Sequence, residues 1–153
     1  MKPTHSQRRS LMGELAMRGL RMTVQRRTLI ETIQEADGHL DAAALLMLAR
    51  QRDPRIDRAT VYRTLNLLKR LRLVDELDLM HLHGEKHYYE AKTTKDHVHL
   101  TCTRCGKVEE LMIRTLERLK RELAQETGFD IRVTRLEVGG LCRKCRNRFK
   151  GSV

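Results

Sequence analysis

The chain has 153 residues, of which 40% are hydrophobic and 33% charged, and its formal net charge is +11. This composition is typical of a folded globular protein, and the length allows one domain or two small ones. The first residues are interrupted by charges too often to form a secretory signal, and no stretch is apolar for long enough to span a membrane. We therefore expect a cytoplasmic protein without a membrane segment.

The positive charge is unevenly distributed. Residues 1–72 carry a net charge of +8, residues 73–91 carry −4, and residues 92–153 carry +7. A basic first half is suited to a polyanionic partner, because Lys and Arg side chains that neutralise phosphates release counterions. A solvated basic surface without a partner would have the same charge.

Helices are predicted for most of the first half. Residues 6–36 read as helical with a break at Gly19, after which Thr23 is a candidate N-cap. Asp41 is placed to cap a helix over "AAALLMLARQR", and Asp57 is placed to cap a helix over "RATVYRTLNLLKRLRLV". Alternation in "LVDELDL" and "KHYYEA", with Gly84 between them, predicts a β-hairpin.

The helix that follows Asp57 is predicted to be amphipathic. At 100° per residue its leucines gather on one side. The other side is polar and rich in residues that read DNA, and it consists of Ala59, Tyr62, Arg63, Asn66, Lys69 and Arg70. Helices followed by a hairpin predict a winged helix, a helix-turn-helix variant whose last helix enters the major groove.

The second half follows a polar connector, "KTTKD". Short strands are predicted for "HVHLTC" and "KVEELM", then a helix for "RTLERLKRELAQETG" and a strand for "DIRVTRLEVGG". The chain thus reads as α+β, with an N-terminal winged helix-turn-helix domain and a small α/β domain. The predicted boundaries are 1–91 for the first domain, 92–96 for the hinge and 97–153 for the second.

Two C-x-x-C pairs carry the strongest chemical signal in the sequence. Cys102 and Cys105 form one pair, and Cys142 and Cys145 form the other. Four thiolates supply a closed tetrahedral shell, which suits a structural zinc ion and leaves no open position. The alternatives are four free thiols or a redox pair, although a redox pair would not account for the second C-x-x-C.

His97 and His99 cannot join that shell if it already has four ligands. In a strand, residues i and i+2 point to the same face, so the H-x-H presents two imidazoles together. Glu90 precedes this pair, Asp96 adjoins it, and His39 stands before the third helix. These residues are candidates for a second metal site, whereas two ordinary polar strand positions are the alternative.

The motifs together resemble one known family. The stretches "GLRMTVQRRTLIETI", "GHLDAAALL", "ATVYRTLNLL", "HYYEA", "HVHLTCTRCGKV" and "GLCRKC" resemble the ferric uptake regulator (Fur) family of bacterial metal-sensing repressors. The resemblance implies a winged helix that reads double-stranded, palindromic operator DNA and a C-terminal domain that forms a homodimer. It implies neither enzymatic activity nor a small-molecule substrate.

The resemblance also implies a role for particular residues. It assigns a structural zinc ion to the four cysteines and a sensory site, which bridges the two domains, to His39, Glu90, His97 and His99. The family's DNA contacts fall on Arg21, Tyr62 and Arg63. A third metal site of many members falls on Asp96, Val98, Glu117 and Thr134, where two of the four ligand types are lost.

The imidazole and carboxylate ligands of the sensory site, without thiolate, suit Fe(II), Mn(II), Co(II) or Zn(II). Among these ions the resemblance implies Fe(II), because peroxide-sensing members of the family tend to have Asp where Glu90 stands and zinc-sensing members often have a Cys in or near the site; Zn(II) and Mn(II) are alternatives. Zinc-, manganese- and peroxide-sensing members of the family are therefore alternative functions. A metalloenzyme with zinc at the same residues and a zinc-stapled interaction module without sensing are further alternatives. His81, His83 and His87 form another histidine cluster, whose role as metal ligands the sequence leaves open.

Overall fold

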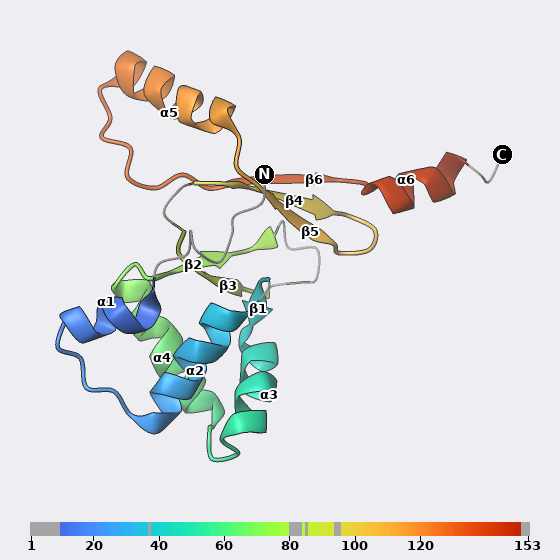
Figure 1. Cartoon of the computed structure of the whole chain (residues 1–153). Helices are drawn as coiled ribbons and strands as arrows, with labels where there is room; N and C mark the ends of the chain where they lie inside the picture. The colour runs from blue at the N-terminus through green and yellow to red at the C-terminus, as the bar shows by residue number, and fades with distance from the viewer. Residues whose placement is uncertain (1–9, 37, 80–83, 85, 94–95, 151–153) are drawn as a thin grey trace. The chain divides into compact units, whose positions relative to one another are not determined.

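The structure is a computed structural model (Figure 1), and it describes residues 10–36, 38–79, 84, 86–93 and 96–150. The described residues form two compact units. The N-terminal unit lies within residues 8–78 and 85–94, and the C-terminal unit lies within residues 79–84 and 95–153.

Four helices build most of the N-terminal unit: α1 (Leu11–Met17), α2 (Val24–Glu35), α3 (Ala42–Arg52) and α4 (Arg58–Arg70). Each of the last three begins at the N-cap that the sequence predicts. The side chains of Thr23, Asp41 and Asp57 accept hydrogen bonds from the backbone N–H groups of the first helical turns. These bonds satisfy donors that a helix start otherwise leaves unpaired, which fixes where each helix begins.

The apolar faces of these helices enclose one core. On α4, Val61, Leu65 and Leu68 are fully or almost fully buried, whereas Tyr62 and Arg63 on the opposite face are exposed. This division confirms the predicted amphipathic helix. The same core includes Leu11, Leu15, Leu29, Ile30, Ile33, Leu45, Ala49 and Ile56.

A small antiparallel sheet completes the N-terminal unit. Strands β2 (Val74–Leu77) and β3 (Tyr88–Ala91) form the predicted hairpin, with Val74 opposite Ala91. A third strand, β1 (Leu40–Asp41), pairs with the other edge of β3. The sequence did not predict β1, which joins the segment before α3 to the hairpin.

The C-terminal unit contains a second three-stranded sheet and two helices. Its elements are β4 (Val98–Cys102), β5 (Val108–Leu111), α5 (Arg114–Thr127), β6 (Leu136–Gly140) and α6 (Arg143–Lys150). Strand β4 is central, antiparallel to β5 and parallel to β6. Helix α5 ends at Gly128, whose φ of 72° is a left-handed conformation that glycine adopts without strain.

Two predictions for this unit need correction. The predicted strand over residues 130–140 begins only at Leu136, because β4 begins at Val98 and Val98 pairs with Leu136. Residues 130–135 therefore have no partner in β4. The cysteine-bearing tail, for which no element was predicted, contains helix α6.

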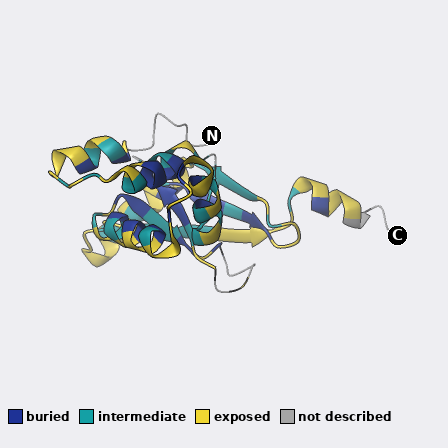
Figure 2. Ribbon diagram, turned by 90° about the horizontal axis from the view of Figure 1, so that it is seen from below, coloured by how far each residue is buried: buried dark blue, intermediate teal, exposed yellow. Residues whose placement is uncertain are grey.

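Burial differs between the two units. In the described part of the C-terminal unit, the buried hydrophobic residues are Leu79, Val98, Cys102, Leu116 and Cys145. Helices α5 and α6 are mainly exposed, as Figure 2 shows for α6 beside the C-terminus, and Leu119 and Leu123 of α5 are each 43% exposed. In the part of the chain that the structure describes, no helix has the length and apolar character needed to cross a membrane.

Candidate metal centres

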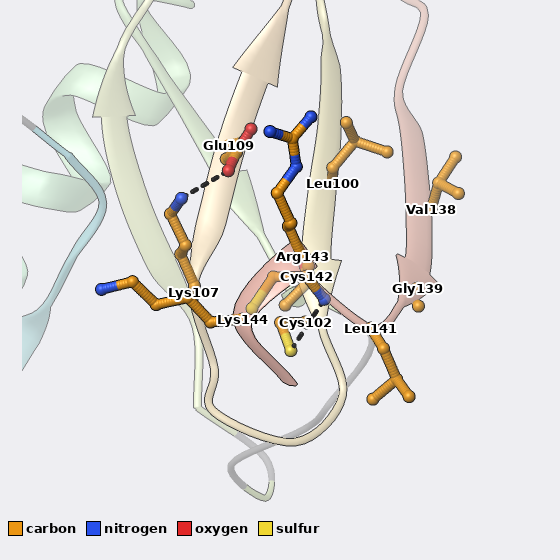
Figure 3. A pocket seen from close by; sticks show the side chains of 12 residues that line it. Leu100, Cys102, Lys107, Glu109, Val138, Gly139, Leu141, Cys142, Arg143 and Lys144 are labelled. Atoms are coloured by element: carbon orange, nitrogen blue, oxygen red, sulfur yellow. Dashed lines mark hydrogen bonds and ion pairs between the residues drawn. The ribbon is translucent and has the colours of Figure 1, made fainter. Parts of the chain in front are cut away.

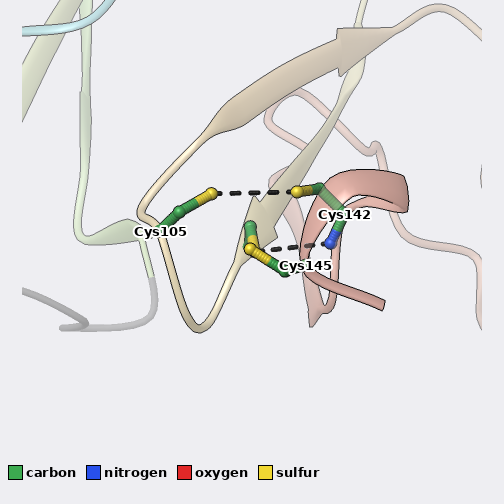
Figure 4. Close-up of side chains that lie close together, drawn as sticks. Cys105, Cys142 and Cys145 are labelled. Carbon is green, nitrogen blue, oxygen red and sulfur yellow. Dashed lines mark hydrogen bonds between the residues drawn. The ribbon is translucent and has the colours of Figure 1, made fainter. Parts of the chain in front are cut away.

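The four cysteines converge within the C-terminal unit (Figure 4). Cys102 ends β4, Cys105 lies in the turn before β5, Cys142 precedes α6 and Cys145 lies in its first turn. Their four Sγ atoms all lie within 4.8 Å of one another, and 3.8 Å separates the Sγ atoms of Cys105 and Cys142. A tetrahedron with zinc–sulfur bonds of about 2.3 Å has edges of about 3.8 Å, so this donor set fits a zinc ion.

Backbone N–H groups prepare one of the thiols for metal binding. The N–H of Cys142 donates to Cys102 Sγ at 3.3 Å. This bond, with those from the N–H groups of Cys105 and Arg104, lowers the pKa of Cys102 to about 6. Burial and the neighbouring thiols instead raise the pKa of Cys145 to about 12. A metal ion would have to displace the Cys145 proton, whereas Cys102 is already a thiolate at neutral pH.

A groove of about 610 Å³ adjoins the cysteines (Figure 3). Leu100, Val138 and Leu141 supply apolar wall, and Lys107, Arg143 and Lys144 supply positive charge. Four thiolates around a divalent zinc ion carry a net charge of about −2, which nearby cations offset. The basic residues around this groove therefore have a local electrostatic role.

The N-terminal unit holds the first pair of predicted sensory ligands. His39 lies directly before β1, and Glu90 lies in β3, the strand with which β1 pairs. His39 Nε2 lies 3.1 Å from Glu90 Oε2, and both side chains are buried. The unpredicted strand β1 is thus what brings His39 to Glu90.

The C-terminal unit holds the second pair. His97 directly precedes β4 and His99 lies in it; both side chains are buried, and their Nε2 atoms are 3.1 Å apart. The two imidazoles therefore share one face, as the H-x-H spacing predicts. Glu110 of β5 lies opposite His99 in the sheet register, and a carboxylate oxygen of Glu110 is within 4.8 Å of a His99 ring nitrogen. Glu110 was missed because this register cannot be read from the sequence.

Both pairs have the spacing of ligands on one ion. Two ligand atoms each about 2.1 Å from a metal stand about 3.0–3.4 Å apart when the angle at the metal is between 90° and 109°. The 3.1 Å separations in the two pairs agree with this value. Imidazole and carboxylate ligands suit Fe(II), Mn(II), Co(II) and Zn(II).

The residues expected at a third metal site are arranged differently. Asp96 and Glu117 are both near the ammonium group of Lys120, and Val98 is a buried aliphatic residue. Thr134 offers only a hydroxyl group.

Of the other histidine cluster, His81 and His83 lie outside the described residues, and His87 Nδ1 is 2.8 Å from Asp78 Oδ1.

The exposed face of α4 is rich in positive charge. Tyr62 is 46% exposed, and Arg63 donates a hydrogen bond from Nη2 to Thr60 Oγ1 at 2.9 Å. A hollow of about 620 Å³ on this face is lined by Arg26, Arg63, Asn66, Leu67, Lys69 and Arg70. Arg21, before α2, is also exposed. This face can contact a phosphate backbone while Tyr62 and Arg63 reach outward.

Comparison with known proteins identifies the family. The model of the ferric uptake regulator family matches residues 17–139. The chain belongs to the ferric uptake regulator family. It is therefore a metal-responsive DNA-binding transcriptional regulator rather than an enzyme, and its fold is the predicted α+β arrangement with an N-terminal winged helix. The family resemblance read from the sequence is confirmed.

Proteins of this family that are named for different metals, iron and zinc, are similar to this chain. The ferric uptake regulation protein of Campylobacter jejuni is 34% identical over 132 residues, covering 85% of this chain and 82% of the relative. The Vibrio cholerae ferric uptake regulator structure, described as revealing a rearrangement of the DNA-binding domains, has a TM-score of 0.69 at 29% identity, covering 85% of this chain and 98% of that one. A zinc uptake regulator complexed with zinc and DNA has a TM-score of 0.63 at 28% identity, covering 91% and 92%.

Proposed function

We propose that this chain is an Fe(II)-responsive repressor in which one exchangeable ion takes ligands from both histidine-containing pairs. His39 and Glu90 supply two ligands, and His97 and His99 supply two more, with Glu110 available beside His99. The observation that carries the proposal is the 3.1 Å separation of buried ligand atoms in each unit. The four cysteines hold a separate structural zinc ion.

Ligand chemistry favours this division of roles. The sensory set contains no thiolate, so it binds a divalent ion less tightly than four cysteines do and can release it. Glu110 would extend the set beyond four ligands, which suits Fe(II) or Mn(II) better than a four-coordinate zinc ion. Iron is the favoured ion, and zinc, manganese or peroxide sensing would use the same residues.

The proposed ion changes DNA affinity by linkage. An ion bound by residues of both units restricts how the units are oriented, and metal binding and DNA binding then stabilise each other if both favour the same orientation. In a homodimer this orientation sets the spacing of two α4 helices, which must match successive major grooves of a palindromic operator. We infer that the protein acts in the cytoplasm, where it meets DNA.

The exposed leucines of helix α5 are an argument for the proposed homodimer. Leu116 is buried, but Leu119 and Leu123, which follow it at helical spacing, are each 43% exposed. The chain itself covers only part of the apolar stripe formed by these three leucines. The exposed part is available for contact with a second copy of the chain. An apolar dimer interface would remove this area from water.

His97→Ala tests the proposed sensory site. The variant is expected to keep about one zinc ion per chain and its dimeric state, because the cysteine shell is unchanged. It should lose the metal-dependent increase in affinity for an operator duplex selected in vitro, and should retain only weak, salt-sensitive binding. Anaerobic fluorescence anisotropy with Fe(II), Mn(II) and Zn(II) measures this, and the ion sensed is the one that acts within its own free concentration in the cell.

His87→Ala is the matched control, because it removes an exposed imidazole that belongs to neither pair. Its metal response should equal that of the parent protein. Full metal-stimulated binding by His97→Ala would show that the sensory assignment is wrong. Loss of the tightly held zinc from His97→Ala would show that the two sites are not separate.

A further inference from the structure

Lys120 of α5 lies between two carboxylates of the C-terminal unit. Its ammonium group forms an ion pair with Asp96 and lies 3.7 Å from a Glu117 carboxylate oxygen one helical turn earlier. The side chains of Lys120 and Asp96 are partly buried, with 24% and 31% of their surface exposed. Hydrogen bonding to Asp96 raises the pKa of Lys120, so the ammonium group remains charged at neutral pH.

These residues do not fit a metal ion. Asp96 and Glu117 are the two carboxylates that the family resemblance places at a third metal site. The other two positions hold Val98, which has no ligand atom, and Thr134, whose neutral hydroxyl is a weak ligand. A divalent ion beside the carboxylates would also meet the positive charge of Lys120 at close range, and the two cations would repel each other.

We propose that the ammonium group of Lys120 replaces the metal ion that would otherwise bind Asp96 and Glu117. We further propose that it positions His97 for the sensory site. Asp96 is joined to His97 by a single peptide bond, and Lys120 ties Asp96 to α5. The backbone just before β4 is therefore attached to α5. This attachment restricts the His97 imidazole to the arrangement in which it meets His99. Partners that orient a metal ligand raise affinity by this kind of preorganisation.

The consequence for sensing is a response with one exchangeable ion per chain. A lysine ammonium is present at every metal concentration in the cell, so the ion pair between α5 and Asp96 does not depend on a second metal-binding step. This inference rests on the proposed sensory role of His97.

The test compares three variants with the parent protein, using Mn(II) as the probe. Lys120→Met removes the charge and keeps most of the side-chain length, whereas Lys120→Arg keeps the charge. Arg118→Met is the matched control, because it removes a cation from the same helix that pairs with Glu122 instead. Calorimetric titration gives the number and affinity of exchangeable ions, and zinc content and melting temperature report on the fold.

The parent should bind one exchangeable Mn(II) per chain. Lys120→Met should bind Mn(II) about tenfold more weakly, which is the lower end of the effect of removing an outer partner of a metal ligand. Lys120→Arg should remain within about threefold of the parent, and Arg118→Met should match it. Asp96→Asn should cause the same loss as Lys120→Met, and the double variant should lose little more, because both changes break one contact.

Two exchangeable Mn(II) ions per parent chain would overturn the proposal, because the carboxylates would then bind a metal despite Lys120. Unchanged Mn(II) affinity in both Lys120→Met and Asp96→Asn would also overturn it. His97→Ala, titrated in parallel, separates this outcome from failure of the sensory site. If His97→Ala loses Mn(II) while the Lys120 and Asp96 variants keep it, only the role of Lys120 is wrong.

Discussion

Replacing Cys102 by serine is expected to unfold the C-terminal unit and leave the N-terminal unit folded. In the described part of this unit, Leu79, Val98 and Leu116 are the buried aliphatic side chains. Burying one such side chain contributes roughly 1.5–3 kcal/mol, so the three supply about 4.5–9 kcal/mol. Structural zinc contributes on the order of 10–16 kcal/mol in small zinc-binding peptides, which is more than this core provides. The unit should therefore depend on its zinc shell.

Hydrogen exchange resolved by residue is the appropriate assay. In Cys102→Ser, amides of β4, β5 and β6 should lose protection together with zinc and the dimer, while amides of α2 and α4 remain protected by their own core. Arg104→Ala changes an exposed residue of the same turn and removes no thiolate, so it should keep zinc and protection. A zinc-free Cys102→Ser dimer with a protected β4 would refute the reasoning.

Three further predictions follow from individual contacts. Tyr62→Ala and Arg63→Ala should each weaken operator binding by about 1–3 kcal/mol at constant salt, as measured by anisotropy. If a variant binds operator as tightly as the parent, the replaced residue does not contact a base. Asp41→Ala should lower the free energy of unfolding of the N-terminal unit in urea by about 0.5–2 kcal/mol, whereas Asp41→Asn should stay close to the parent. If both variants lost the same stability, the Asp41 side chain would not act as an N-cap. Protons compete with zinc for the four thiolates, and bound zinc keeps the pKa of Cys102 below the value of about 6 that it has without metal, so the zinc should persist at pH 7 and dissociate only below about pH 6. Metal analysis after gel filtration over a pH series would check this, and half-release at pH 7 would contradict it.

Features set by neighbouring residues were predicted well from the sequence. Thr23, Asp41 and Asp57 cap their helices through bonds to N–H groups three residues later, and such local bonds leave a clear pattern. The amphipathic face of α4 was equally readable, because burial follows the helical period. The cysteine cluster was predicted because two C-x-x-C pairs have few other uses.

Strand pairings and ion pairs between distant segments were not predicted. Strand β1 has two residues and exists only because β3 offers an edge, yet it brings His39 to Glu90. Glu110 becomes a candidate ligand through its register with His99 across a turn. The pairing of Asp96 with Lys120 joins residues far apart in the chain, and no periodic pattern reveals such a pair. The domain boundaries and the roles of the individual site residues stay predictions.

The parallel pairing of β4 and β6 has a consequence for how the chain folds. Val98 lies beside Leu136, although β5 and α5 stand between them in the sequence. Non-local pairing of this kind forms slowly, since a long loop must close before any contact is gained. Cys142 and Cys145 follow β6, so the zinc shell cannot close until these last cysteines have been synthesised. We expect the N-terminal unit to fold first, and a cell that is short of zinc to accumulate chains with a folded first half and an unfolded second half.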